Sequence, residues 1–423
     1  MAELKGFKGL RYTKRAGDMD SLICPPYDVI SEEERREYLR RNEYNIIRLE
    51  LPREGEDPYE TAGCTLRQWL HDGILAQDDA DSLYIYEEEF EEKGRIMSFK
   101  GIIALVKLEE FSKGIILPHE ETLPKAKADR FNLMTATGCN FSQIYSLYMD
   151  EKGTTEDYIE KISSCTPEVC ITDGSGVTHR LWRTADEGII SAVISDFAGR
   201  RLYIADGHHR YETAINYRNA MREAGKSKPG GGADYVMMTL VDLNSPGLVV
   251  YPTHRVVHDV AGFSAQTVRE KSAKYFDISR MPDKASAFEE LGSAYAEGKK
   301  AFVFYSGGGF DLFTLKDFES VCREYGSISR EVMELDVSIL HRLVLEGVMG
   351  IDAARIADQT NVVYTRDADE AVSLADKGDC AFIMNPTRIS QIKDVANAGQ
   401  KMPQKSTYFY PKLITGLVMN KII

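Results

Sequence analysis

A short apolar segment that leads directly into a glycine and a run of cationic side chains constrains this chain more than any other feature. The segment RRLYIADGHHRYETAINYR covers residues 200–218, and residues 202–205 within it form the apolar run typical of a buried strand. Over residues 211–222 the apolar side chains recur with helical spacing. The sequence therefore predicts a strand that turns into a helix at Gly207.

The residues at this junction have the chemistry of an anion site. The first turn of a helix presents unpaired backbone N–H groups, and Gly207 lets a ligand approach the main chain closely. Arg210 can bind a phosphate in bidentate fashion, and His208 or His209 can donate a hydrogen bond or move a proton. Asp206 can hold a histidine tautomer or bind a metal ion. The alternative is that Asp206 caps the helix and both histidines lie in the core, although two adjacent histidines cannot both point inward from one helical turn.

The composition is that of an ordinary globular protein. A chain of 423 residues with 43% hydrophobic content can bury more than one core, so we expect two or three domains. The net charge of −14 argues against a surface built to bind nucleic acid. No apolar run approaches the roughly 20 residues that span a bilayer, and the first residues, MAELKGFKGLRY, are polar. We therefore expect a cytoplasmic protein that does not enter a membrane; the sequence does not indicate its oligomeric state.

Capping and turn residues predict the elements that precede the junction. A Ser-Glu capping box precedes a helix over residues 32–42, and an Asp-Pro pair opens a helix over residues 58–72. Strands over residues 82–89 and 99–108 flank the charged turn EEKGR. Two strands separated by so short a polar turn predict a β-hairpin.

A change in composition marks the predicted domain boundary. The segment KSKPGGGAD, residues 226–234, is rich in glycine and proline and predicts a linker. We place a phosphate-binding region over residues 1–228 and a C-terminal α/β region over residues 234–423, in which strands such as KAFVFYS alternate with helices. The glycines of SGGGF, residues 306–310, lie between two apolar runs and predict a hairpin turn. The fold class predicted for the whole chain is α+β.

A second group of reactive side chains lies in the segment PHEETLPKAKADR, residues 118–130. Lys125, Lys127 and Arg130 can donate hydrogen bonds to a phosphate. Glu120 can act as a base or as a ligand for Mg²⁺, and binding loops are often built in this way. A loop with this much charge is equally well explained as a solvated surface, so both interpretations stay open.

Two further segments carry chemistry with a structural alternative. NIIRLELP, residues 45–52, predicts a strand on which Arg48 and Glu50 share one face, because strand side chains alternate. Glu50 is then either the partner of an Arg48 ion pair or a catalytic carboxylate. MPQKSTYFYPKLITGL, residues 402–417, either closes the pocket or packs its aromatic rings in the core.

As a set, these segments resemble a bacterial and archaeal family known as domain of unknown function 1015. The motifs that carry the resemblance are PPYDVIS, NIIRLELP, LPHEETLPKAKADR, ADGHHRYETA and MPQKSTYFYPKL, and they cover essentially the whole chain. The pentapeptide DGHHR is also similar to the G-[EH]-[RH]-R phosphate motif of the ParB and sulfiredoxin superfamily, which includes nucleotide-binding partition proteins and free serine kinases. This resemblance implies a ParB/sulfiredoxin-like mixed α/β core with a large insertion that holds the hairpin and the charged loop, followed by the C-terminal α/β region.

The resemblance also implies roles for single residues. Residues 207–210 would cradle the phosphates of a nucleotide, with Asp206 beside the reacting groups. The PPYD segment at residues 25–28 resembles the proline-containing segment that leads into the ParB fold. Glu50 would be the counterpart of the catalytic carboxylate of the kinases.

The expected activity is phosphoryl transfer from ATP or ADP to a small hydroxylated metabolite, with Mg²⁺ bridging phosphate oxygens. Arg210 and the two histidines would supply positive charge and hydrogen bonds. Glu50 or Glu120 would be the base for the acceptor hydroxyl, and Asp206 would contact the metal ion or a histidine. Two alternatives stay open: a phosphohydrolase that uses water as the acceptor in the same pocket, and a nucleotide-responsive binding module without turnover. The sequence contains no Walker A, H-E-x-x-H, G-x-S-x-G or dinucleotide fingerprint, which removes the enzyme classes that depend on them.

Overall fold

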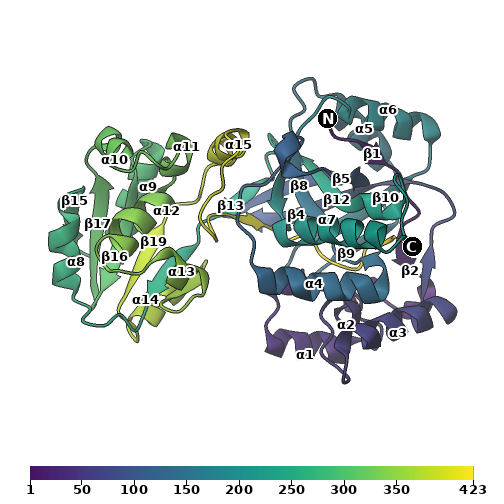
Figure 1. Cartoon of the computed structure of the whole chain (residues 1–423), viewed down its shortest axis with the longest axis horizontal. Coiled ribbons are helices and arrows are strands. Elements are labelled where there is room, and N and C mark those ends of the chain that lie inside the picture. The colour runs from purple at the N-terminus through teal and green to yellow at the C-terminus, as the bar shows by residue number, and fades with distance from the viewer. Residues whose placement is uncertain (423) are drawn as a thin grey trace. The chain divides into compact units, whose positions relative to one another are not determined.

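The chain folds into two compact units (Figure 1). The computed structural model describes residues 1–422. The first unit contains Met1–Pro118, Thr122–Val249 and the residues from Pro411 on, and the second contains His119–Glu121 and Val250–Tyr410. The sequence places the domain boundary at residues 228–234, whereas in the structure the next strand, β12 (Tyr235–Asp242), still belongs to the first unit because it pairs with two of its strands.

The first unit combines a large mixed sheet with helices. Its other strands are β1 (Leu4–Lys5), β2 (Leu10–Tyr12), β3 (Leu75–Gln77), β4 (Leu83–Glu92), β5 (Arg95–Lys107), β6 (Ile116–Leu117), β7 (Cys139–Asn140), β8 (Ile144–Tyr148), β9 (Val169–Thr172), β10 (Thr178–Thr184), β11 (Leu202–Asp206) and β21 (Asn420–Lys421). Its α-helices are α1 (Glu32–Arg41), α2 (Ile47–Glu50), α3 (Pro58–His71), α4 (Pro124–Thr137), α5 (Thr154–Ser163), α6 (Glu187–Phe197) and α7 (His208–Glu223). The nine-stranded sheet has the order β6-β11-β8-β12-β5-β4-β10-β9, with β1 paired to β5.

The register of this sheet brings the predicted junction next to the start of β8. β11 runs parallel to β6 and antiparallel to β8, so that Asp206 at the end of β11 lies opposite Tyr145. The loop that precedes β8 therefore meets the turn that follows β11. The helix α7 then packs against α4, which in turn packs against α3 (Figure 1).

Local sequence signals account for several of these elements. Ser31 and Glu34 form the capping box of α1, and Asp57 accepts hydrogen bonds from the first turn of α3. The predicted hairpin is β4–β5, whose two turn residues, Lys93 and Gly94, both have positive φ. Positive φ at both positions is what the commonest two-residue hairpin turn requires.

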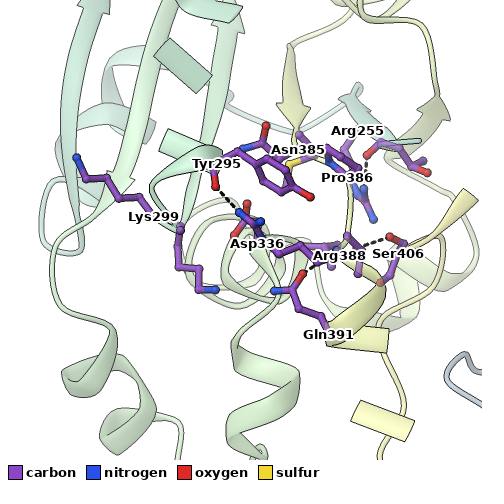
Figure 2. Close-up of a pocket in the computed structure, with 15 residues that line it drawn as sticks. Arg255, Tyr295, Lys299, Asp336, Asn385, Pro386, Arg388, Gln391 and Ser406 are labelled. Carbon is purple, nitrogen blue, oxygen red and sulfur yellow. Dashed lines mark hydrogen bonds between the residues drawn. The ribbon is translucent and has the colours of Figure 1, made fainter. Parts of the chain in front are cut away.

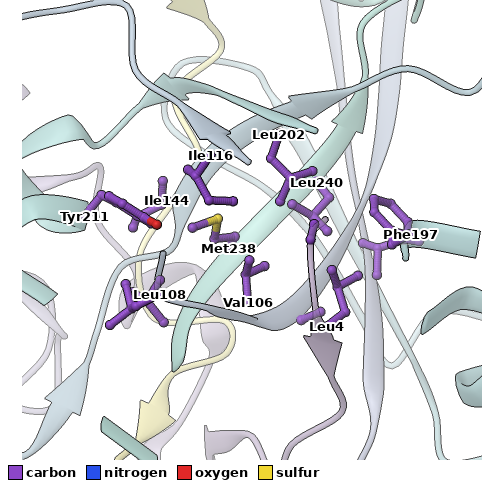
Figure 3. Close-up of a cluster of buried hydrophobic side chains, with 14 of the residues drawn as sticks. Leu4, Val106, Leu108, Ile116, Ile144, Phe197, Leu202, Tyr211, Met238 and Leu240 are labelled. Carbon is purple, nitrogen blue, oxygen red and sulfur yellow. The ribbon is translucent and has the colours of Figure 1, made fainter. Parts of the chain in front are cut away.

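One face of the sheet carries the main hydrophobic core of the first unit (Figure 3). Val106 in β5 and Met238 and Leu240 in β12 point to the same side because side chains alternate along a strand. Phe197 of α6 and Tyr211 of α7 complete this core. The burial of Tyr211 fixes α7 on the sheet and thereby fixes the turn at which the helix begins.

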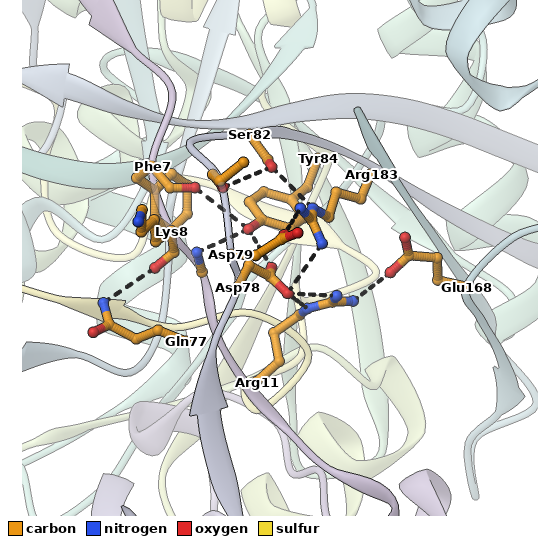
Figure 4. A network of polar contacts seen from close by, with 12 residues as sticks. Phe7, Lys8, Arg11, Gln77, Asp78, Asp79, Ser82, Tyr84, Glu168 and Arg183 are labelled. Carbon is orange, nitrogen blue, oxygen red and sulfur yellow. Dashed lines mark hydrogen bonds and ion pairs between the residues drawn. The ribbon is translucent and has the colours of Figure 1, made fainter. Parts of the chain in front are cut away.

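A polar network fastens the N-terminal segment to the same sheet (Figure 4). Asp78 accepts hydrogen bonds from Arg11 at 2.7 and 3.1 Å and from the hydroxyl of Tyr84 at 2.6 Å. Arg183 approaches the same carboxylate at 3.4 Å. The side chain of Asp78 is only 10% exposed, so its charge depends on these donors.

The C-terminal segment returns to the first unit. β21 pairs antiparallel with β7, and Met419 and Thr415 form isolated bridges with Leu10 and Cys24. These pairings place Lys412, which lies only a few residues upstream, within reach of the junction.

The second unit is built on a six-stranded sheet with the order β15-β17-β16-β19-β14-β18. Its strands are β13 (Val249–Tyr251), β14 (His254–Val257), β15 (Phe276–Met281), β16 (Ala301–Ser306), β17 (Gly309–Leu315), β18 (Val362–Thr365), β19 (Cys380–Met384) and β20 (Tyr408–Tyr410). Its helices are α8 (Ala265–Ser272), α9 (Lys284–Ala296), α10 (Phe318–Glu324), α11 (Arg330–Met333), α12 (Asp336–Ile339), a π-helix (Leu340–Glu346), α13 (Ala353–Ala357), α14 (Ala368–Ala375) and α15 (Ile389–Asn397). The predicted turn at SGGGF joins β16 to β17.

Both units mix helices with sheets that contain antiparallel pairs, so the predicted α+β class is confirmed. Over residues 1–422, no helix has both the length and the apolar character needed to cross a bilayer.

Candidate functional site

The strand-to-helix junction has the geometry that the sequence predicts. β11 ends at Asp206, and α7 begins at His208 and runs for 16 residues. Gly207 between them has φ +95°, a conformation that side-chain-bearing residues rarely adopt. A Cβ atom at Gly207 would also lie 2.9 Å from Nε of Arg210, so glycine is needed for the Arg210 side chain to fold back over the turn.

Arg210 and Lys412 surround the carboxylate of Asp206 with positive charge. Nη1 of Arg210 donates to the backbone carbonyl of Gln143, and Nη2 lies 3.4 Å from Oδ2 of Asp206. Nζ of Lys412 lies 3.2 Å from the same oxygen. Burial by itself would raise the pKa of Asp206, but the charges of Lys412 and Arg210 outweigh burial and hold the pKa well below its usual range.

These neighbours argue against the prediction that Asp206 binds a metal ion. A carboxylate that already faces two cations is a poor ligand for a third. Within residues 1–422 there is also no cluster of three or more histidine, cysteine, aspartate or glutamate side chains that could hold a metal ion.

The two histidines of the junction have different surroundings. The side chain of His208 is buried, with 3% exposed, and it acts electrostatically on Asp206. Nε2 of His209 accepts a hydrogen bond of 2.9 Å from the backbone N–H of Leu123, which precedes α4. This nitrogen therefore carries no proton, and His209 orients the start of α4.

Glu50 does not lie on a strand, as the alternation of NIIRLELP predicts. Residues Ile47–Glu50 form the short helix α2, because the side chain of Asn45 accepts the N–H of Ile47 and starts a helical turn. One of the two alternatives for Glu50, an ion pair with Arg48, is therefore wrong: Arg48 donates to the carbonyl of Leu39.

The carboxylate of Glu50 is instead held by residues from distant parts of the first unit. It is 1% exposed, accepts a hydrogen bond of 2.6 Å from Ser142, and lies 3.5 Å from Nη1 of Arg130. Burial raises the pKa of Glu50, and the charges of Arg130 and Arg210 offset only part of that effect. The guanidinium of Arg130 also lies 4.0 Å from the ring centre of Tyr27, within the PPYD segment.

These groups line one pocket, whose empty space, including the solvent at its mouth, is about 410 Å³. Glu50, Arg130, Ser142 and Arg210 contribute its polar wall. Its other wall is mainly apolar and is formed by Leu133, Met134, Cys139, Phe141 and Val236. The structure thus brings Glu50, Arg130 and Arg210, which are far apart in the sequence, to one cavity that is charged on one side and apolar on the other.

The remaining predicted residues of the charged loop lie elsewhere. Lys125 is exposed, and the ammonium of Lys127 pairs with Glu212 at 2.7 Å. Glu120 belongs to the second unit, where its carboxylate accepts the backbone N–H of Lys405. None of the three lines the pocket that contains Glu50 and Arg210.

Two residues of the site were not among those predicted. Lys412 lies in the motif MPQKSTYFYPKL, but its pairing with Asp206 could not be predicted because about 200 residues separate the two in the sequence. Ser142 carries no local signal, because its partner Glu50 lies 92 residues away in the sequence.

The chain belongs to a family of uncharacterised proteins, described as Protein of unknown function (DUF1015), whose model matches residues 4–338. The predicted family is therefore confirmed. No curated protein matches the sequence.

Several solved structures resemble the chain weakly. A mutant free serine kinase in complex with ADP has 13% sequence identity and a TM-score of 0.37, and the match covers 75% of this chain and 92% of the kinase chain. SbnI with a C-terminal truncation, from Staphylococcus aureus, has 12% identity and a TM-score of 0.38, covering 75% of this chain and 87% of SbnI. A conserved hypothetical protein from Pyrococcus furiosus has 12% identity and a TM-score of 0.34, and the match covers 75% of this chain and 95% of that protein's chain. Because these TM-scores are low, the function is argued below from the residues of this chain.

Proposed function

We propose that the pocket beside the β11–α7 junction binds the phosphates of ATP or ADP, and that the protein transfers a phosphoryl group to the hydroxyl of a small metabolite. The observation that carries this proposal is that two guanidinium groups, of Arg130 and Arg210, and the buried carboxylate of Glu50 line one pocket. Phosphoryl transfer asks a protein mainly for positive charge around the moving group and for a base placed at the acceptor.

Arg210 would bind the phosphates together with the first-turn N–H groups of α7. The backbone N–H of Tyr211 is already bonded to the carbonyl of Gly207, so it is not one of these donors. The contact of Arg210 with the Gln143 carbonyl holds the guanidinium in place without neutralising its charge. The apolar wall of the pocket would accommodate the nucleoside.

Glu50 would act as the base. In the transfer step the acceptor oxygen forms a bond to phosphorus, the bond from phosphorus to the bridging oxygen of the nucleotide breaks, and the acceptor proton moves to the Glu50 carboxylate. A raised pKa suits this role, because a base works best when its pKa lies near the working pH. Ser142 and Arg130 would hold the carboxylate in position.

Asp206 would position Arg210 and Lys412 rather than bind a metal ion. No step of the proposed transfer requires a metal ion that the protein holds by itself, and any Mg²⁺ would depend on the phosphate oxygens of the nucleotide for most of its ligands.

The proposal is tested by incubating the protein with ATP or ADP, with and without Mg²⁺, alone and with a panel of hydroxylated metabolites. Phosphorylated product that forms only when an acceptor is present, and that is lost in Glu50→Gln, supports the kinase. Nucleotide cleavage without an acceptor identifies a phosphohydrolase, and thermal stabilisation by nucleotide without turnover identifies a binding module. If neither ATP nor ADP binds, the proposal fails altogether.

A further inference from the structure

The second unit contains a separate pocket, whose empty space, including the solvent at its mouth, is about 440 Å³ (Figure 2). Its walls come from the end of α9, the starts of α12 and α15, and the segments around β14 and β19. Four cationic residues line it, Arg255, Lys299, Lys300 and Arg388, whereas Asp336 is its only carboxylate. The proposed nucleotide site has none of these residues.

Arg255 is the most unusual member of this pocket. It is 1% exposed, and over residues 1–422 no carboxylate lies within ion-pair distance of its guanidinium. Its Nη1 and Nη2 donate to the backbone carbonyls of Thr253 and Lys405, while its Nε–H has no hydrogen-bond acceptor within the described chain. Burial lowers the pKa of Arg255 to about 10, and the charges of Tyr364 and Glu120 offset only part of that effect.

Arg388 is a second guanidinium with no carboxylate within ion-pair distance in the described part of the chain, although its charge also acts on Asp336. It donates to the carbonyl of Tyr295, and its Cζ lies 3.8 Å from the ring centre of the same residue. It stands directly before α15, a helix of nine residues whose first turn adds the positive end of the helix dipole.

Each of the two lysines already forms an ion pair with a glutamate. Lys300 is 15% exposed and pairs with Glu334 at 2.7 Å, and the more exposed Lys299 pairs with Glu297 at 2.6 Å. Both of these glutamates lie outside the lining of the pocket. Burial raises the pKa of Asp336 to about 7, with the charge of Lys300 offsetting part of the effect. The four cations of the lining are thus met by three carboxylates, Asp336, Glu297 and Glu334, which leaves a small excess of positive charge.

We propose that this pocket of the second unit binds a small phosphorylated metabolite with at least two negative charges. A buried guanidinium with no carboxylate within ion-pair distance is costly, and a bound phosphate group would reduce that cost while accepting the unused Nε–H of Arg255. The pocket offers a nucleoside little to stack on, since its apolar lining residues are Val337, Met384 and Pro386 and the Tyr295 ring is already engaged by Arg388.

The experiment is calorimetric titration of the full chain carrying Arg210→Ala, which disables the proposed nucleotide site. The probes are inorganic phosphate, pyrophosphate and citrate, at pH 8, where Asp336 is mostly ionised. We expect saturable binding of pyrophosphate that is weakened about tenfold by Arg388→Gln or by Lys300→Gln. Asp336→Asn, which removes a negative charge, should tighten binding, and the exposed Lys377→Gln should leave it unchanged.

Opposite effects of removing a cation and removing an anion identify a charge-selective site and exclude a general loss of folding. Absence of saturable pyrophosphate binding would overturn the proposal. If Arg388→Gln and Lys300→Gln bind pyrophosphate as tightly as the parent protein does, the proposal is also overturned, because the binding would then lie elsewhere. Binding of citrate but not of pyrophosphate or phosphate would refute the assignment to a phosphorylated ligand.

Discussion

Replacement of Gly207 by alanine tests the geometry of the junction most sharply. Any L-residue in the left-handed region costs about 1–2 kcal/mol. The new Cβ would also lie 2.9–3.1 Å from three atoms of the Arg210 guanidinium, which must then move and weaken its bonds to Gln143 and Asp206. Losing a hydrogen bond to a charged group costs about 1.5–3 kcal/mol more. We therefore expect Gly207→Ala to lower the free energy of unfolding by about 2.5–5 kcal/mol.

Gly225, just beyond the other end of α7, provides the matched control. It has φ +67°, and a Cβ atom there would meet no atom within 4 Å. Gly225→Ala should therefore cost only the backbone term of about 1–2 kcal/mol. Urea unfolding of the two variants measures the difference, and a parallel titration with ADP should show weaker binding for Gly207→Ala alone. Equal losses of stability together with equal nucleotide affinities would refute the reasoning.

Three further predictions concern the first unit. Glu50→Gln should reduce phosphoryl transfer about 10²–10⁴-fold while ADP affinity in a titration stays close to wild type, since an amide cannot accept the proton; a loss of affinity equal to the loss of turnover would contradict this. His179 is nearly fully buried, and although burial lowers its pKa, the carboxylates of Asp173 and Glu88 raise it to about 9. Its imidazolium should therefore stabilise the fold fully below about pH 6.5 and progressively less as the pH rises through 9. The difference in unfolding free energy between wild type and His179→Gln should then shrink from pH 6 to pH 10. A difference that stays constant over this range would exclude the role. Asp78→Ala leaves Arg11 with Glu168 alone and removes an acceptor of the Tyr84 hydroxyl, and it should cost about 2–4 kcal/mol in urea unfolding, whereas an unchanged midpoint would show that the network contributes nothing.

The junction could be predicted from sequence because every signal for it is local. A buried strand, a glycine and a helical period follow one another within 20 residues, and the structure reproduces them as β11, Gly207 and α7. Capping and turn residues acted in the same way for α1, α3 and the β4–β5 hairpin. These elements depend on contacts between near neighbours in the chain.

Predictions that required tertiary contacts were less successful. The apolar run of residues 45–52 has the composition of a strand, but packing and the Asn45 side chain select a helical turn. Glu50 was a candidate from strand alternation and from the resemblance, and its actual neighbours, Arg130 and Ser142, come from α4 and from the loop before β8, respectively. Lys412 reaches Asp206 only because the C-terminal segment pairs with the first unit.

The domain boundary illustrates the same limit. KSKPGGGAD has the composition of a linker, yet the strand that follows it lies at the centre of the first sheet, between β8 and β5. Composition identifies a loop, but strand pairing decides to which unit the next element belongs.

The central claim is that Arg210 at the β11–α7 junction binds nucleotide phosphate, and a nucleotide titration of Arg210→Ala tests it most directly. Arg201, an exposed arginine immediately before β11, is the matched control for loss of one positive charge. We predict that ADP or ATP binds the wild type and Arg201→Ala with similar affinity, and that Arg210→Ala loses about 2–5 kcal/mol of binding free energy. Unchanged nucleotide affinity in a folded Arg210→Ala protein would contradict the account.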